Sequence, residues 1–257
     1  MRRIFLKGWR PVSVLILLFV VWEISSRIFD IPVWLLPPPS QVWVEIFASW
    51  PNYSSHLAST VRLSVAGFLI GCSTGLAVAV CLHLVPKLRE TLYPLMILSQ
   101  NIPIIVLAPL LVIWFGFGLA PKLIIITLVC FFPVTIAALD GFRQTGSDMM
   151  HYMKMAGATT QQIFWKLEWP HAMPSVFSGL KIAATYSVMG AVISEWLGAK
   201  EGIGVYMTLA SSSFRTTQVF VAIFLIMVLS LLFFGAIVFL EKRMIRWKET
   251  GEEERNA

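Results

Sequence analysis

Residues 219–240 read VFVAIFLIMVLSLLFFGAIVFL, an apolar run of 22 residues without a charged side chain. The hydrocarbon core of a bilayer is about 30 Å thick, and a helix needs about 20 mainly apolar residues to cross it. This run therefore predicts a membrane-spanning helix. Five further runs of the same kind lie upstream, each bounded by proline, glycine or charged residues. The six predicted spans are 12–29, 62–85, 94–115, 121–140, 173–196 and 218–240.

The composition of the 257 residues agrees with a membrane protein. Hydrophobic residues make up 57% of the chain and charged residues only 13%, whereas roughly a quarter of an ordinary soluble domain is charged. A soluble chain of this length would still have to cover its surface with polar side chains, so a soluble enzyme is excluded. The 20 Lys and Arg residues lie between the apolar runs and form no basic face interleaved with aromatic residues. No nucleic-acid partner is therefore predicted.

The cationic residues also predict which way the chain faces, because short cytoplasmic loops carry an excess of Lys and Arg. With the N-terminus inside, 14 of the 20 fall in cytoplasmic segments and five fall outside, and Lys181 lies just inside the cytoplasmic end of the fifth span. The prediction is an all-α membrane protein with six spans and both termini in the cytoplasm. Residues 1–11 form the cytoplasmic N-terminus, 12–245 the transmembrane domain and 246–257 a cytoplasmic tail.

The third predicted span, 94–115, is the most irregular of the six, since Pro103 and Pro109 should bend it. The external segment 30–61 contains three tryptophans, Trp34, Trp43 and Trp50, which suit headgroup depth. We interpret it as an interfacial element in which Ser40 caps a short helix, with a plain loop as the alternative.

The loop 141–172 between the fourth and fifth spans carries the clearest local signals. Ser147 begins a helix and Gly157 is placed to end it. Thr159 and Gln162 form a capping-box pattern that begins a second short helix, and Pro170 is expected to terminate it. The apolar positions of this second helix are Ile163, Phe164 and Leu167. Apolar side chains on the water side of a membrane usually have a protein partner.

The spacing from Gly157 to Leu167, Trp169 and Pro170 resembles the cytoplasmic EAA loop of the membrane subunits of bacterial ABC importers. The departure is that the Glu-Ala-Ala slot holds His151, Tyr152 and Met153. Four other stretches resemble the nitrate/sulfonate/taurine branch of those permeases. This branch includes permeases for thiamine-precursor pyrimidines. Together with the loop, the resemblance covers roughly residues 32–245. The four stretches are LLPPPSQVW, NIPIIVLAPLLVIWFGFGLAPK, FFPVTIAALDGFR and SGLKIAATYSVMGAVISEWLGAKEGIGVYM.

The resemblance implies a type I ABC importer permease fold in the bacterial inner membrane. The chain would form the substrate path without binding a cofactor or metal itself, since ATP and Mg²⁺ belong to a separate ATPase. The implied partners are two ATPase copies, a second copy of this permease, an external substrate-binding protein and the lipid bilayer. The implied cargo is a small polar or anionic solute. The implied residues of the ATPase-coupling loop are Met155, Ala156, Gly157, Ala158, Thr159, Gln162, Ile163, Phe164, Leu167 and Pro170.

Polar residues inside predicted spans are candidates for the translocation path. Gln100 and Asn101 either line the path or form helix-helix hydrogen bonds. Glu195 either shapes an outer gate or is a structural partner for Arg215 or for a backbone donor. Glu23 is expected to pair with Arg27 four residues on, and Lys181 is expected to extend to the cytoplasmic interface.

Two other function classes fit the sequence less well. A membrane-embedded enzyme is disfavoured because the sequence contains no HExxH, no GxSxG and no paired intramembrane aspartates. A self-contained secondary transporter would usually show internal repeats and more spans. The sequence also contains no GxxxxGK[ST] phosphate-binding motif, so ATP hydrolysis is expected on another chain.

Overall fold

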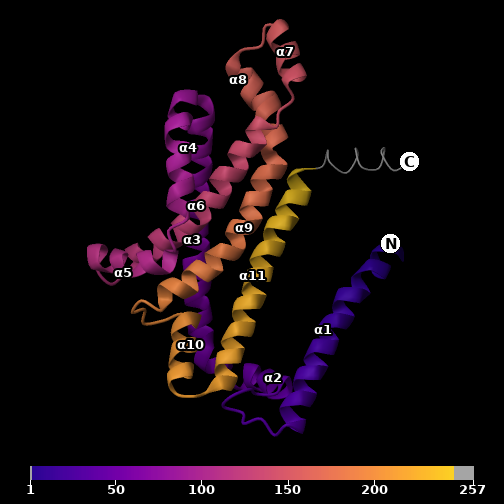
Figure 1. Cartoon of the computed structure of the whole chain (residues 1–257), viewed down its shortest axis with the longest axis vertical. Coiled ribbons are helices and arrows are strands. Elements are labelled where there is room, and N and C mark those ends of the chain that lie inside the picture. The colour runs from indigo at the N-terminus through magenta and orange to yellow at the C-terminus, as the bar shows by residue number, and fades with distance from the viewer. Residues whose placement is uncertain (1, 246–257) are drawn as a thin grey trace.

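The computed structural model describes residues 2–245, with side chains from residue 12 onward, and the predicted tail 246–257 lies outside the described residues. Within this range the regular structure is helical (Figure 1). The elements are α1 (Arg2–Ile28), α2 (Pro39–Ala48), α3 (Trp50–Leu84), α4 (Pro86–Gln100), α5 (Ile104–Phe115), α6 (Leu119–Arg143), α7 (Ser147–Met155), α8 (Thr160–Ile163), a π-helical turn η1 (Phe164–Glu168), α9 (Trp169–Glu195), α10 (Ile203–Ser212) and α11 (Thr216–Met244).

Four helical stretches among the described residues are long and apolar enough to cross a bilayer, and a bent pair adds a fifth candidate. The four are Trp50–Leu84, Leu119–Arg143, Thr160–Glu195 and Thr216–Met244. The predicted span 12–29 coincides with the C-terminal part of α1, which leans away from the bundle (Figure 1). The remaining helices lie at the two ends of the molecule, with α7 and α8 at one end and α2 and α10 at the other.

The third predicted span, 94–115, is not one helix. It is divided into α4 and α5, whose axes differ by 99°, and the break lies at Asn101–Pro103. Pro103 has no amide hydrogen and disfavours the helical conformation of the residue before it, so the chain turns at this point. Pro109 lies inside α5 and does not end that helix.

The centre of the bundle is α6, which packs between α3 and α9. Three glycines of α3, at positions 67, 71 and 75, face α6. A Cβ atom on Gly71 would lie 2.6 Å from the Cβ of Cys130 and 2.8 Å from the carbonyl oxygen of Thr127. The small-residue ridge that the sequence shows therefore allows close backbone approach, as such ridges do in membranes.

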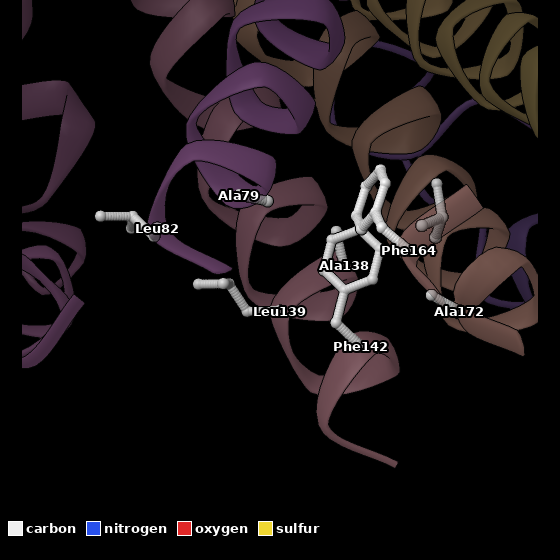
Figure 2. Close-up of a cluster of buried hydrophobic side chains, with 8 residues drawn as sticks. Ala79, Leu82, Ala138, Leu139, Phe142, Phe164 and Ala172 are labelled. Carbon is white, nitrogen blue, oxygen red and sulfur yellow. The ribbon is translucent and has the colours of Figure 1, made fainter. Parts of the chain in front are cut away.

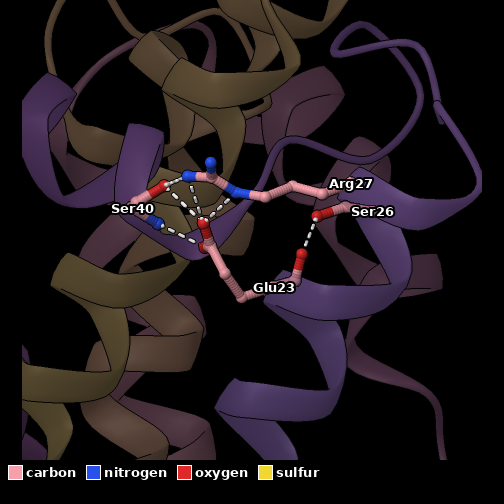
Figure 3. A network of polar contacts seen from close by, with 4 residues as sticks. All are labelled: Glu23, Ser26, Arg27 and Ser40. Carbon is pink, nitrogen blue, oxygen red and sulfur yellow. Dashed lines mark hydrogen bonds and ion pairs between the residues drawn. The ribbon is translucent and has the colours of Figure 1, made fainter.

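The outer segment is joined to α1 by a polar network (Figure 3). The predicted pair is confirmed: Nε of Arg27 donates to Oε1 of Glu23 over 2.7 Å. The predicted cap is wrong, because α2 begins at Pro39 and Ser40 lies inside its first turn. Instead, the backbone N–H of Ser40 donates to Oε2 of Glu23 over 3.0 Å. A carboxylate from α1 thus satisfies an otherwise free donor at the positive end of the α2 dipole.

One further expectation needs correction. Residues 50–61 of the predicted interfacial segment belong to α3, which continues into the bundle without a break. The extension of Lys181 to the cytoplasmic interface stays a prediction, but the structure gives this side chain a partner. Its Nζ donates to Oε2 of Glu241 over 2.9 Å and joins α9 to α11. Pairing inside the bundle offsets part of the cost of placing both charges away from water.

Candidate functional site

The first half of the loop 141–172 has the local structure that its residues predict. Helix α7 begins at Ser147 and has Asp148 in its first turn, where a negative side chain interacts favourably with the helix dipole. It ends at Met155, and Gly157 has a φ of +79°. The left-handed conformation at the second position after a helix is a common stop that glycine adopts without strain.

The predicted capping box at the start of α8 is also confirmed. The backbone N–H of Gln162 donates to the hydroxyl oxygen of Thr159 over 3.3 Å. In return, the backbone N–H of Thr159 donates to Oε1 of Gln162 over 2.8 Å. These reciprocal bonds satisfy two donors that the helix itself leaves free, so this helix begins where the sequence indicates.

The predicted stop at Pro170 is wrong. Helix α8 continues through the π turn η1 into α9, and Pro170 lies in the first turn of α9. The backbone N–H of Trp169 donates to the carbonyl oxygen of Phe164, five residues earlier. Proline lacks an amide hydrogen but is tolerated in the first turn of a helix. The change of hydrogen-bond register at η1 therefore lets the chain pass this proline without ending the helix.

The exposed apolar surface of this loop differs from the one expected. Ile163 and Phe164 are buried against the bundle, and Leu167 is half-buried. The large exposed side chains are those of Met149, Tyr152, Met155 and Trp165, and Met155 is 81% exposed. We refer to these four residues as the docking surface. Of these four residues, the family resemblance implies a role for Met155 alone. Sequence reasoning misses the other three because they do not lie on the apolar face of the second helix, which the sequence indicates as the contact face.

A groove of about 500 Å³ opens at the break between α4 and α5. Both predicted amide residues, Gln100 and Asn101, line it. Asn101 is held by its own helix, since its Nδ2 donates to the carbonyl oxygen of Ile97 over 2.7 Å. The opposite walls come from α6 and α9 and include the aromatic rings of Phe132 and Tyr186, which the sequence did not single out. The groove thus combines a few polar groups with aromatic walls, the usual composition of a small-molecule site.

Glu195 does not line this groove. It is 1% exposed at the outer end of α9, and its carboxylate accepts two hydrogen bonds inside the chain. The hydroxyl of Thr60 donates to Oε1 over 2.7 Å, and the backbone N–H of Gly204 donates to Oε2 over 2.8 Å. The same threonine oxygen accepts the backbone N–H of Ile203 over 2.8 Å. We call these four residues the outer network, which fixes the start of α10 on α3 and α9.

Comparison with known proteins identifies the family. Residues 67–246 match the family described as "Binding-protein-dependent transport system inner membrane component". The chain is 34% identical over 240 residues to the formylaminopyrimidine transport permease protein ThiX of Halalkalibacterium halodurans, which covers 93% of this chain and 96% of that protein.

Two further relatives are more distant but also match over most of their length. The riboflavin transport system permease protein RibX of Chloroflexus aurantiacus is 28% identical, over 93% of this chain and 89% of that protein. The taurine transport system permease protein TauC of Escherichia coli is 27% identical, over 92% of this chain and 88% of that protein. The chain therefore belongs to the inner-membrane components of binding-protein-dependent transport systems, as a multi-pass permease of the ABC transporter class.

Proposed function

We propose that this chain is the transmembrane subunit of an importer that couples substrate movement to ATP hydrolysis on a separate ATPase. The working complex would contain two copies of this chain, two ATPase subunits with ATP and Mg²⁺, and an external substrate-binding protein. Two copies are favoured because a few helices cannot by themselves surround a polar path, and a symmetric pair lets polar groups face each other instead of lipid.

The proposed topology has six spans, with both termini in the cytoplasm. The excess of Lys and Arg in the predicted cytoplasmic segments supports this orientation. The arrangement of the helices agrees with it, since the N-terminal end of α1 and the C-terminal end of α11 point toward the end of the molecule that carries α7 and α8 (Figure 1). In this topology α2 and α10 lie at the external side.

The observation that carries the proposal is the exposed docking surface at the end of the molecule opposite to α2 and α10. Met149, Tyr152 and Met155 project from a short helix in a loop between two membrane helices. Exposed apolar side chains of this size on the water side of a membrane fit a protein partner. We propose that residues 141–172, hereafter the coupling loop, dock on the ATPase through this surface and through Ala156 to Gln162.

We propose that the groove at the break between α4 and α5 is part of the translocation path. Its amides at Gln100 and Asn101 can exchange hydrogen bonds with a polar heterocycle, and the rings of Phe132 and Tyr186 can pack on a planar one. With the printed name of the ThiX relative, this favours a small pyrimidine as cargo over a sulfonate or nitrate. Glu195 would act at a distance from the groove, by fixing the outer end of α9.

The Gly157→Arg variant tests the docking role. A Cβ atom at Gly157 would meet no other atom within 4 Å, so the arginine enters open space, and the positive φ costs only about 1–2 kcal/mol. We expect normal membrane insertion but loss of ATPase co-purification and of transport. Gly146→Arg is the matched control, because Gly146 lies in the same loop with equally open surroundings and an ordinary φ of −59°. Normal ATPase binding and transport by the Gly157→Arg variant would contradict the proposal.

A further inference from the structure

A buried polar pair lies where the coupling loop joins the bundle. His83 is the second-to-last residue of α3, and Glu168 is the last residue of η1. The distance from Nε2 of His83 to Oε2 of Glu168 is 2.9 Å, and the two side chains are only 16% and 11% exposed. A carboxylate can only accept, so the imidazole N–H donates. The bond connects two elements that are 85 residues apart in the chain.

Aromatic rings attach the same turn to α6, because Phe164 of η1 packs against Phe142 of α6 (Figure 2). The ring of His83 stacks on Phe142 with centroids 4.7 Å apart and planes 29° apart. Phe164, at the start of η1, lies 5.6 Å from Phe142 and 6.0 Å from His83 and is only 4% exposed. Phe142 and Phe164 belong to one buried cluster with small and aliphatic residues of α3, α6 and α9. Both ends of η1 are therefore attached to the bundle.

The backbone at this junction is not a regular α-helix. A π turn changes the hydrogen-bond register from four residues to five and is often found at functional sites. Pro170 and Pro174 follow it and supply no amide hydrogen to the preceding turn. By contrast, most side chains of α7 and α8 are exposed and have no comparable attachment. Without the side-chain contacts of His83 and Phe164, the coupling loop would bend at η1 when pushed.

We propose that His83 and Glu168 are positioning residues that transmit the displacement of the coupling loop to α3 and α6. This inference rests on the proposed function, in which the ATPase moves the coupling loop. The hydrogen bond fixes the last residue of η1 to α3, and the buried contact between Phe164 and Phe142 fixes its first residue to α6. Because α3 and α6 are in close contact along the glycine ridge, a movement of the turn is passed to both helices together.

Two double variants remove the link without leaving a buried charge unpaired. His83→Phe keeps a ring that can stack on Phe142 but removes the donor. Glu168→Leu, made together with it, removes the carboxylate that would otherwise be left buried alone. The second double variant is His83→Phe with Glu168→Gln, in which the glutamine has nearly the size of the glutamate that it replaces. It takes the place of the first double variant if that one does not assemble into the complex. His171→Phe is the matched control, because this nearby histidine of α9 is exposed.

The measurement uses the full complex in lipid and compares the nucleotide-free state with the state trapped by ATP, Mg²⁺ and vanadate. One spin label is placed at Lys154, an exposed residue of α7 in the coupling loop that is not part of the docking surface. In separate samples one is placed at Leu98, which is exposed in α4 beside the groove. Distances are measured between the two copies. A Cys81→Ser background avoids labelling the exposed native cysteine, and Cys72 and Cys130 are buried.

In the wild type and in His171→Phe, trapping should change the distances at both positions. In either double variant, the Lys154 distance should still change, while the population that responds at Leu98 falls roughly tenfold or more, the factor expected for loss of a hydrogen bond to a charged group. A full response at Leu98 in an assembled double variant would overturn the inference. If the wild type showed no response at Lys154, the proposed function itself would fail, and the inference with it.

Discussion

The Gly202→Ala substitution tests the outer network at its tightest contact. Gly202 has a φ of +136°, a region that is essentially restricted to glycine. A Cβ atom there would lie 2.1 Å from Cδ of Glu195 and 2.4 Å from each carboxylate oxygen. The added methyl group therefore cannot be accommodated unless the carboxylate moves away from its two donors, Thr60 and Gly204.

The expected cost has two parts. The backbone conformation costs about 1–3 kcal/mol for a residue other than glycine. Displacing a buried carboxylate weakens two charge-assisted hydrogen bonds, each of which contributes about 1.5–3 kcal/mol. With partial relaxation we expect a loss of about 3–6 kcal/mol in the free energy of unfolding. For a chain of this size, at about 2–4 °C per kcal/mol, that corresponds to a fall in the apparent Tm of roughly 6–24 °C.

Thermal unfolding of the purified permease in detergent measures this shift. Gly118→Ala is the matched control, since a Cβ atom there would meet nothing within 4 Å and its φ of 163° is extended backbone that any residue adopts. We expect the control to change the apparent Tm by no more than a few degrees, because the substitution neither strains the backbone nor touches a neighbour.

A double-mutant cycle with Glu195→Ala separates the clash from the backbone strain. Removing the carboxylate removes the atoms that the new methyl group would meet, so Gly202→Ala in this background should cost only the backbone part, about 1–3 kcal/mol. The substitutions should therefore be less than additive. An equal cost of Gly202→Ala with and without Glu195 would refute the assignment of a tight contact between them.

Three further predictions concern the bundle. Gly71→Leu should prevent close contact of α3 and α6 and sharply lower the yield of folded protein in size-exclusion chromatography. Gly235→Leu is the control and should leave the yield unchanged, because a Cβ atom at Gly235 would meet nothing within 4 Å. Lys181→Ala should lower the apparent Tm more than the double variant Lys181→Ala with Glu241→Ala, because it leaves one half-buried charge unpaired. The opposite order would contradict the pairing. Phe164→Ala should lower the free energy of unfolding by about 3–5 kcal/mol and reduce stimulation of the ATPase. Thermal unfolding measures the first effect and phosphate release the second. An unchanged Tm would show that the ring is not packed as described.

Signals that depend on neighbours in the chain could be read from the sequence. The start of α7 at Ser147, its end before Gly157 and the capping box at Thr159 all follow from local hydrogen-bonding needs, and the structure has them. The apolar runs likewise marked helices, because length and hydropathy decide whether a segment can cross a bilayer. The family followed from the motifs of the loop and of the spans around it.

Features that depend on distant segments could not be read in this way. Pro170 was expected to end a helix, but the π turn before it changes the hydrogen-bond register and the helix continues. Phe164 was placed on a contact face, but a pocket formed by α3 and α6 buries it. Lys181 lacked a visible partner because Glu241 is 60 residues away. In each case the tertiary contact decides the outcome, and a single sequence does not display it.

Uptake by proteoliposomes tests the central claim most directly. The permease is reconstituted alone or with its ATPase and substrate-binding protein. The uptake of a labelled small pyrimidine, the proposed cargo, is measured with ATP, without ATP, or with an imposed ion gradient. The account predicts uptake only when the ATPase, the binding protein and ATP are all present. Uptake by the permease alone down an ion gradient would contradict it and would show a self-contained transporter.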